Sequence, residues 1–182
     1  MMKHLTVKEK EAESFEKLKG AFHYKNAMSA PKLKKIVFNV GTGTAIKKDK
    51  NKNTAIADRL TKITGQKPAT RGAKQSIATF KIRQGDPIGV VVTLRGKRMY
   101  AFLEKLINVA LPRTKDFRGI SRTVVDSIGN LTMGIKEHTI FPETADEDIK
   151  DVFGLSVTLV SSAKTKAEGM AFFELIGVPF KK

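Results

Sequence analysis

The 182-residue chain contains no cysteine, and aromatic residues make up only 7% of it. Without cysteine it can form neither a disulfide framework nor a thiolate metal site, which agrees with a reducing compartment. No apolar run approaches the roughly 20 residues that a membrane-spanning helix needs. The charged start of the chain also lacks the apolar core of a signal peptide. We therefore expect a cytoplasmic protein that does not enter a membrane.

Acidic residues are scarce in one part of the chain only. The whole sequence has 34 Lys and Arg against 18 Asp and Glu, which gives a net charge of +16. Residues 1–100 hold 23 of the basic and seven of the acidic residues, whereas residues 101–182 hold 11 of each. Charge confined to one segment creates a surface field that attracts polyanions. Nucleic acid is the partner that this distribution favours.

The stretch from Gly65 to Tyr100 organises the chain, which has the length of a single domain spanning residues 1–182. A turn signal at Gly65–Pro68 leads into a basic segment without a sustained period. The β-branched run Ile88–Leu94 follows and is the strongest strand signal. We expect a long basic loop at about 70–87, anchored by a rigid strand and mobile in the free protein. Loops of this length are usually functional or disordered.

Residues 32–40, 88–95 and 154–161 alternate between apolar and polar side chains with the period of a β-strand. One face of each strand is predicted to be core, and the other carries small polar or basic residues such as Lys35, Asn39 and Thr93. The predicted inward residues are Ile36, Phe38, Val40, Val90, Val92, Leu94, Leu155, Val157 and Leu159. Such strands are typical of an antiparallel sheet with one covered face.

Helical periodicity predicts the elements that cover that face. Residues 6–22, 54–64, 97–110 and 165–176 carry apolar stripes, and the second and fourth end at Gly65 and Gly177. A short strand is expected at 131–135. The predicted fold class is therefore α+β, an antiparallel-rich sheet with helices packed on one face and the other face open for RNA.

Several enzyme and metal motifs fail on inspection. Gly41 and Gly43 follow a strand, as in a dinucleotide-binding loop, but Ile46 stands where the third glycine belongs, and there is no P-loop. His4, His23 and His138 share no ligand spacing, so no metal or cofactor is expected. The acids Glu143, Asp146, Glu147, Asp148 and Asp151 lack the order of a calcium loop. They form a solvated acidic loop or a docking patch for a basic protein.

Several strings in register resemble the bacterial large-subunit ribosomal protein five family, whose members bind 5S ribosomal RNA. They cover nearly the whole chain in order. The strings are I-V-F-N-V-G-T-G at Ile36–Gly43, G-Q-K-P at Gly65–Pro68, F-K-I-R-Q-G-D-P-I-G at Phe80–Gly89, V-T-L-R-G at Val92–Gly96, D-F-R-G-I-S at Asp116–Ser121, M-G-I at Met133–Ile135, I-F-P-E at Ile140–Glu143 and G-V-P-F at Gly177–Phe180.

The resemblance implies a non-enzymatic structural protein of the large ribosomal subunit, a monomer within the ribosome. By motif match, Asn39, Gln66 and Thr93 are expected to contact 5S ribosomal RNA, and large-subunit ribosomal RNA is a further expected partner. The nearby basic residues Lys35, Lys67 and Arg95 are expected to join the three polar residues on the RNA.

The resemblance also implies two further contacts. The loop from Arg71 to Arg83 is expected to reach the elbow of the transfer RNA in the peptidyl site. Its candidate residues are Arg71, Lys74, Gln75, Ser76, Lys81 and Arg83. Residues Ile140, Phe141, Pro142 and Glu143 are expected to face a small-subunit head protein as an intersubunit bridge.

The sequence departs from the family pattern at a few places. Gln75 and Val91 stand where basic residues are common, which weakens individual contacts, and His138 replaces a usual glutamine. Thr42 and Thr44 replace a frequent apolar and a frequent acidic residue. Two other functions remain open from the residues alone: a free RNA chaperone or DNA-binding module, and a nucleotide-dependent enzyme using Gly41 and Gly43.

Overall fold

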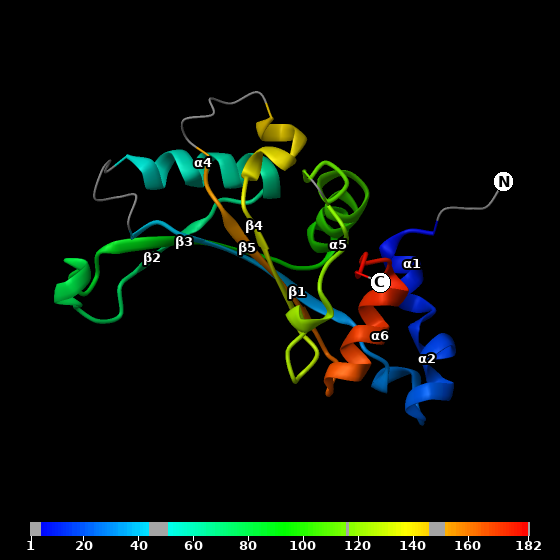
Figure 1. The fold of residues 1–182 in the computed structure, drawn as a ribbon. Helices are drawn as coiled ribbons and strands as arrows, with labels where there is room; N and C mark the ends of the chain where they lie inside the picture. Colours follow the sequence, from blue (N-terminus) through cyan, green and yellow to red (C-terminus); the bar gives the residue numbers. More distant parts are fainter. Residues whose placement is uncertain (1–4, 44–50, 116, 146–151, 182) are drawn as a thin grey trace. The chain divides into compact units, whose positions relative to one another are not determined.

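The computed structural model describes residues 5–43, 51–115, 117–145 and 152–181 (Figure 1). In these ranges five strands form one antiparallel sheet in the order β2-β3-β1-β5-β4. The strands are β1 (Leu33–Gly41), β2 (Ala69–Gly72), β3 (Pro87–Leu94), β4 (Leu131–Ile135) and β5 (Leu155–Ser161). The helices are α1 (Val7–Ala12), α2 (Ser14–Phe22), α4 (Lys52–Thr64), α5 (Lys97–Lys105) and α6 (Lys166–Ile176). The predicted α+β fold is confirmed.

The chain divides into two compact units. The first consists of Met1–Ile36, Arg95–Met133 and Thr158–Lys182, and the second of Val37–Leu94 and Gly134–Val157. Each unit is therefore built from segments that are far apart in the sequence, and the boundaries fall within β1, β4 and β5 and at the end of β3. The expectation of a single domain for residues 1–182 stays a prediction.

The strand faces agree with the alternation in the sequence. Ile36, Phe38 and Val40 of β1 have at most 1% of their surface exposed. The inward residues of β3 and β5 are buried in the same way, while Asn39 is exposed and Thr93 is half-buried. Burial of such side chains contributes about 1.5–3 kcal/mol each to folding. The predicted inward and outward faces of all three strands are confirmed.

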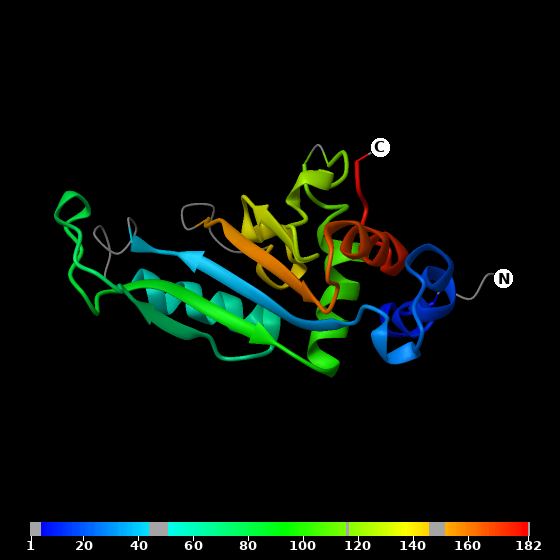
Figure 2. The same ribbon diagram turned by 90° about the horizontal axis from the view of Figure 1, so that it is seen from below.

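Helix α4 covers the core side of β3 in the second unit (Figures 1 and 2). Its apolar stripe, Ile56, Leu60 and Ile63, is at most 2% exposed. The helix ends where Gly65 takes the left-handed conformation with φ 67°, which glycine adopts without steric strain. That turn brings the chain back toward the sheet and places Gln66 next to β3.

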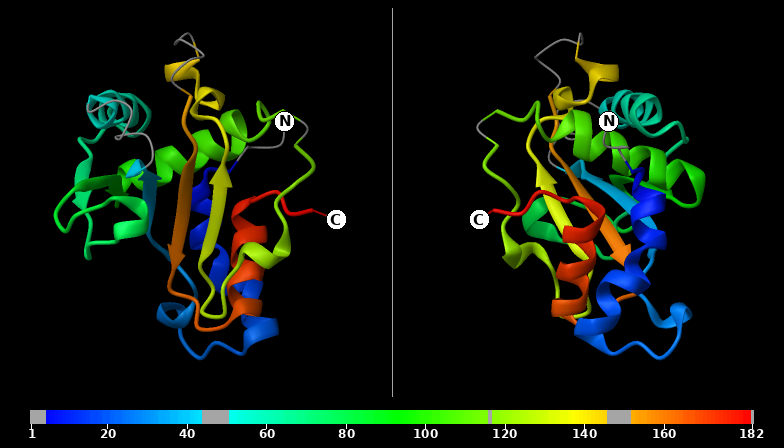
Figure 3. Two further views of the ribbon diagram at one scale, coloured as in Figure 1. Left: turned by 60° about the vertical axis from the view of Figure 1, so that its left-hand side comes forward. Right: turned by 90° about the vertical axis from the view of Figure 1, so that its right-hand side faces the viewer.

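The helices of the first unit pack on one another. Helices α1 and α2 each contact α6, and α1 also contacts α5 (Figure 3). The single helix expected at 6–22 is divided at Glu13, and the one expected at 97–110 ends in a π-helical turn at Leu106–Ala110. Helix α6 begins after Thr165, whose side chain accepts a hydrogen bond from the Glu168 amide and caps the helix.

Two half-buried tyrosines connect segments of the first unit through hydrogen bonds. The Tyr24 hydroxyl donates to Glu168 over 2.6 Å, and the Tyr100 hydroxyl donates to Glu11 over 2.9 Å. Burial, followed by the bond to Glu11, raises the pKa of Tyr100 to about 12. Within the described ranges, no helix has the length and the apolar character that crossing a membrane requires.

Candidate nucleic-acid interface

Strand β1 provides the first element of the candidate interface. Because Phe38 and Val40 point into the core, Asn39 between them points to the opposite side, where it is exposed. Its backbone carbonyl accepts a hydrogen bond from the Ser156 hydroxyl of β5 over 3.2 Å. The backbone at Asn39 is thereby held by a neighbouring strand while the side chain faces solvent.

Strand β3 provides the second element, and Gln66 is tied to it. Thr93 lies between the buried Val92 and Leu94 and therefore points outward, as Asn39 does. The side-chain nitrogen of Gln66 donates to the Thr93 carbonyl over 3.2 Å. This bond fixes the turn after α4 against β3. Gln66 thus positions the neighbouring Lys67, which is exposed.

Strand β2 corrects the expected start of the basic loop. Residues Ala69–Gly72 are not loop but a strand that pairs with β3, with Arg71 opposite Gly89. The Arg71 Cβ lies 4.0 Å from the position that a Cβ on Gly89 would occupy, so the two residues share a face. Thr93 is on that face too, because it follows Gly89 by four residues. Arg71 therefore belongs to the open face rather than to a loop.

We call Asn39, Arg71, Val91 and Thr93 the open face of the second unit. Their side chains lie opposite the side that α4 covers, and each is exposed or half-buried. The face combines a carboxamide, a hydroxyl and a guanidinium on a rigid sheet. These groups can bond to phosphate and sugar oxygens, which is how most contacts to nucleic-acid backbones are made.

Residues 73–86 form what we call the hairpin tip, which extends beyond β2 and β3 (Figure 2). The expected irregular loop is instead a closed turn. Ile77 and Ile82 exchange two backbone hydrogen bonds, and Ala78–Phe80 is a 3-10 turn between them. Nearer the strands, the Ala73 amide donates to the Asp86 carbonyl and the Gly85 amide donates to the Ala73 carbonyl. The expectation that this segment is mobile stays a prediction.

The predicted basic and polar residues of the tip are exposed. Lys74, Gln75, Ser76, Lys81 and Arg83 all lie on its surface, although the Ser76 hydroxyl also accepts a bond from the Gln84 amide. Lys35 and Arg95, expected to accompany Asn39 and Thr93, fall within the first unit. Lys35 is half-buried and Arg95 is exposed.

Gly41, the last residue of β1, and Gly43 do not form a phosphate-binding loop in the described residues. The Thr42 amide, which such a loop would offer to a phosphate, donates to the Ile88 carbonyl over 2.8 Å. A Cβ on Gly43 would meet Ile82 and Ile88 at ordinary van der Waals distances of 3.7 Å or more. Neither Gly41 nor Gly43 has a positive φ. Gly41 and Thr42 serve sheet pairing, and Thr44 lies outside the described residues.

The histidines and acids likewise form no catalytic or metal-binding cluster where the structure describes them. His138 is fully buried and stacks on Phe153 with ring centroids 4.2 Å apart, so it is a packing residue. No group of three potential metal ligands occurs among the described residues. His4 and the acids Asp146, Glu147, Asp148 and Asp151 lie outside them.

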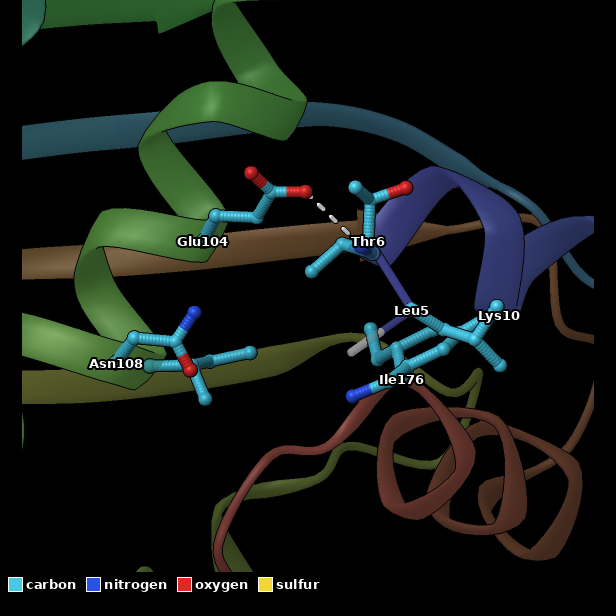
Figure 4. A pocket seen from close by; sticks show the side chains of 8 residues that line it. Leu5, Thr6, Lys10, Glu104, Asn108 and Ile176 are labelled. Carbon is cyan, nitrogen blue, oxygen red and sulfur yellow. Dashed lines mark hydrogen bonds between the residues drawn. The ribbon is translucent and has the colours of Figure 1, made fainter. Parts of the chain in front are cut away.

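A small pocket in the first unit lies among α1, α5 and α6 (Figure 4). Its titratable side chains are Lys10 and Glu104, and Glu104 accepts a hydrogen bond from the Val7 amide over 3.0 Å. The remaining lining is formed by Thr6, Asn108 and apolar side chains. A carboxylate that is engaged at the start of a helix has a structural role, and the pocket holds no nucleophile–base pair.

Comparison with known proteins supports the resemblance to a ribosomal protein family. A model described as ribosomal protein L5 matches residues 26–83, and one described as the ribosomal L5P family C-terminus matches residues 87–180. A "Large ribosomal subunit protein uL5" of Desulfatibacillum aliphaticivorans is 52% identical over 91% of this chain and 92% of the relative. Proteins of the same name from Mycoplasma mycoides and Trichlorobacter lovleyi are 51% and 50% identical, over 88% and 93% of this chain and 88% and 94% of theirs. The chain belongs to the ribosomal L5 family.

Membership of the ribosomal L5 family makes the chain a structural protein and not an enzyme. A structural role agrees with the absence of a phosphate-binding loop at Gly41 and Gly43 and of a nucleophile–base pair in the small pocket. The resemblance that the sequence motifs carried is therefore confirmed.

The four residues expected at an intersubunit bridge differ in exposure within this family member. Ile140 is 8% exposed and Phe141 is fully buried, whereas Pro142 and Glu143 are exposed on the 3-10 turn Pro142–Thr144. A partner protein can therefore touch Pro142 and Glu143 directly, while Ile140 and Phe141 support the turn from below. The bridge itself stays a prediction.

Two positions that depart from the family pattern now have a place. Val91 is half-buried on the open face opposite Ala69, and Gln75 is exposed on the hairpin tip. Both are surface positions, so the missing charges leave the core unchanged. The sequence did not predict that Arg71 joins the open face, although Ala69-Thr70-Arg71 between a turn and a glycine is a weak strand signal.

Proposed function

We propose that the chain is a cytoplasmic, structural component of the large ribosomal subunit whose open face binds 5S ribosomal RNA. The observation that carries this proposal is the convergence of Asn39, Arg71 and Thr93 on one uncovered side of the sheet. The names of the relatives place those proteins in the large subunit. The net charge of +16, concentrated in residues 1–100, supports a polyanionic partner.

The chemistry of the open face suits folded RNA better than duplex DNA. Amide and hydroxyl side chains can reach the 2′-hydroxyls that line the shallow minor groove of A-form RNA. Arg71 and the exposed Lys67 can neutralise phosphates at the edge of the same surface. Lys35 and Arg95, which belong to the first unit, are proposed as further phosphate contacts. Gln66 is proposed as an RNA contact that also positions Lys67.

Two further contacts complete the proposal. The hairpin tip contacts the transfer RNA of the peptidyl site through Lys74, Lys81 and Arg83, with Gln75 and Ser76 as polar neighbours. Pro142 and Glu143 contribute to a bridge with a small-subunit head protein, supported by Ile140 and Phe141. The exposure of the tip cations and of Pro142 and Glu143 supports both assignments. Large-subunit ribosomal RNA is proposed as a further partner of the chain, which acts as a monomer within the ribosome.

The direct test is a binding titration that compares 5S ribosomal RNA with transfer RNA and with a duplex DNA of the same length as the 5S ribosomal RNA. We expect the 5S complex to be the tightest, and its association constant to fall steeply with salt because cations displace counterions from phosphates. Equal affinity for the three would show a general nucleic-acid chaperone instead. Saturable binding of a mononucleotide would favour the nucleotide-dependent alternative.

A further inference from the structure

The hairpin tip exposes apolar side chains where its charges lead one to expect only polar ones. Phe80 is 58% exposed and Ile77 is 45% exposed. Both belong to the turn of residues 77–82, and they are two of the five large hydrophobic residues exposed in the described chain. Exposure of an aromatic side chain to water raises the free energy in proportion to the exposed apolar area. Contact with phosphates alone does not account for it.

Hydrogen bonds close this turn without help from a partner. The Ile77 amide donates to the Ile82 carbonyl over 2.9 Å, and the Ile82 amide donates back over 3.2 Å. Lys81 closes the 3-10 turn with a positive φ of 49°, one of two such non-glycine residues among those described. Residues other than glycine adopt this conformation at some energetic expense, often at functional sites. The shape that presents Phe80 is therefore preformed.

The base of the tip is fixed as firmly as its end. The Arg83 amide donates to the Asp86 carboxylate over 2.7 Å, and the Gln84 amide donates to the Ser76 hydroxyl over 2.9 Å. A Cβ on Gly72 would lie 3.0 Å from the Gly85 carbonyl oxygen, so the two arms approach as closely as the missing side chain permits. A preformed tip loses little conformational entropy when it binds.

The surroundings of the apolar pair select RNA as the partner. Lys74, Lys81 and Arg83 are exposed on the same tip, and its one acid, Asp86, is engaged by the Arg83 amide. A protein partner for two apolar side chains would have to tolerate three cations around them. RNA offers both complements, because flat nucleobases stack on aromatic rings and phosphates flank every base.

We propose that the tip recognises RNA by packing Phe80, supported by Ile77, on an exposed nucleobase while Lys74, Lys81 and Arg83 hold the neighbouring phosphates. The ligand is thus a folded RNA with a base surface open at its outside, rather than a continuous duplex. This inference rests on the proposed contact between the tip and peptidyl-site transfer RNA. It adds that the contact is partly apolar and specific for accessible bases.

The test uses ribosomes assembled with variant chains and a fluorescently labelled transfer RNA bound in the peptidyl site. Its dissociation rate is measured at a low and a high concentration of monovalent salt. The variants are Phe80→Ala, Phe80→Tyr, Lys74→Ala and Thr79→Ala, the last being a matched control on the same turn. Occupancy of each variant chain in the particle is checked by mass spectrometry.

We expect Phe80→Ala to speed dissociation about fivefold or more at both salt concentrations, since loss of base stacking is not screened by salt. Phe80→Tyr keeps the ring and should retain the transfer RNA within about twofold of the parent. Lys74→Ala should speed dissociation mainly at low salt, because its contribution is electrostatic. Thr79→Ala should leave the rate unchanged.

Each other result overturns a different part of the account. If Phe80→Ala matches Thr79→Ala while Lys74→Ala speeds dissociation, the tip binds phosphates only, and the apolar inference alone is wrong. If none of the variants changes the rate, the proposed transfer RNA contact fails with it. If Phe80→Ala instead removes another protein from the particle, the apolar pair is a protein contact.

Discussion

The open face and the hairpin tip are both surfaces of the second unit, but they are supported in different ways. Asn39 and Thr93 alternate with Phe38, Val40, Val92 and Leu94, which are at most 2% exposed. The tip is held by hydrogen bonds within residues 73–86, and Ala73 is the only buried residue among them. A surface on a core is rigid because moving it disturbs packing, whereas a surface held by local bonds can open by itself.

This difference suits two kinds of RNA contact. A permanent partner, which we propose 5S ribosomal RNA to be, suits a face whose groups keep fixed spacings. A partner that binds and dissociates repeatedly, as we propose for transfer RNA, suits a small preformed tip whose local opening leaves the core intact. We therefore predict that substitutions in the open face affect 5S binding and that substitutions in the core beneath it affect stability. Substitutions in the hairpin tip should affect only the hydrogen-exchange protection of the tip and the retention of transfer RNA.

The largest expected effect is on the core side of the face. Phe38→Ala should lower the free energy of unfolding by roughly 3–5 kcal/mol, because it leaves a cavity beneath β1. Asn39→Ala, one residue away on the exposed side, should leave that free energy nearly unchanged. Chemical denaturation of both variants measures this difference. Unfolding by Asn39→Ala with an intact Phe38→Ala would mean that the strand register is shifted by one.

Next in size is the loss of the bond at the base of the tip. Asp86→Ala removes the carboxylate that accepts a hydrogen bond from the Arg83 amide. Because this site is exposed, the bond should contribute about 1.5 kcal/mol, the lower end of the range for hydrogen bonds to charged groups. Hydrogen exchange should accelerate at Arg83 and Gly85, while amides of β1 keep their protection. Equal acceleration in β1 would show that the tip and the sheet unfold together.

A smaller effect is expected at the open face itself. Asn39→Ala and Thr93→Ala should each weaken 5S binding by about 0.5–1.5 kcal/mol, the usual worth of one hydrogen bond. Val91→Ala on the same face offers no hydrogen bond and serves as the control. Isothermal titration with 5S ribosomal RNA gives the three values, and an effect of Val91→Ala as large as the other two would argue for apolar packing instead.

The smallest effect is electrostatic and appears in a slope. Arg71→Ala should reduce the slope of log K against log salt for 5S binding by about 1, because one phosphate contact is lost. Lys35→Ala should do the same if its half-buried ammonium meets a phosphate. Lys74→Ala, on the tip, should leave the slope for isolated 5S ribosomal RNA unchanged. A slope that responds to Lys74 but not to Arg71 would exchange the roles of the two regions.

The sequence predicted the elements whose signal is local. Alternation fixed the faces of β1, β3 and β5, and glycines at Gly65 and Gly177 marked the ends of α4 and α6. Strand β2 was missed because all four of its residues are exposed and it has no apolar face to reveal it. Its pairing with β3, the Ile77–Ile82 bridge and the bond from Gln66 to Thr93 depend on residues that meet only after folding. The local sequence pattern carries no information about which distant residues come into contact after folding.

The same limit explains the candidate site. Asn39 and Thr93 could be placed on an open face by counting along their own strands. Arg71 could not, because its side is decided by the partner strand. The exposure of Phe80 could not be predicted either. A single aromatic residue in a basic segment can be a buried core residue or an exposed contact residue, and the sequence pattern is the same in both cases.

The most direct test of the central claim compares the two regions in a single binding experiment. One variant combines Asn39→Ala, Arg71→Ala and Thr93→Ala, and the other combines Lys74→Ala, Lys81→Ala and Arg83→Ala. Each changes three surface residues. At fixed salt, we predict that the open-face variant loses about tenfold or more in affinity for 5S ribosomal RNA, while the tip variant stays within about threefold of the parent. Loss of 5S binding by the tip variant with an unaffected open-face variant would contradict the account.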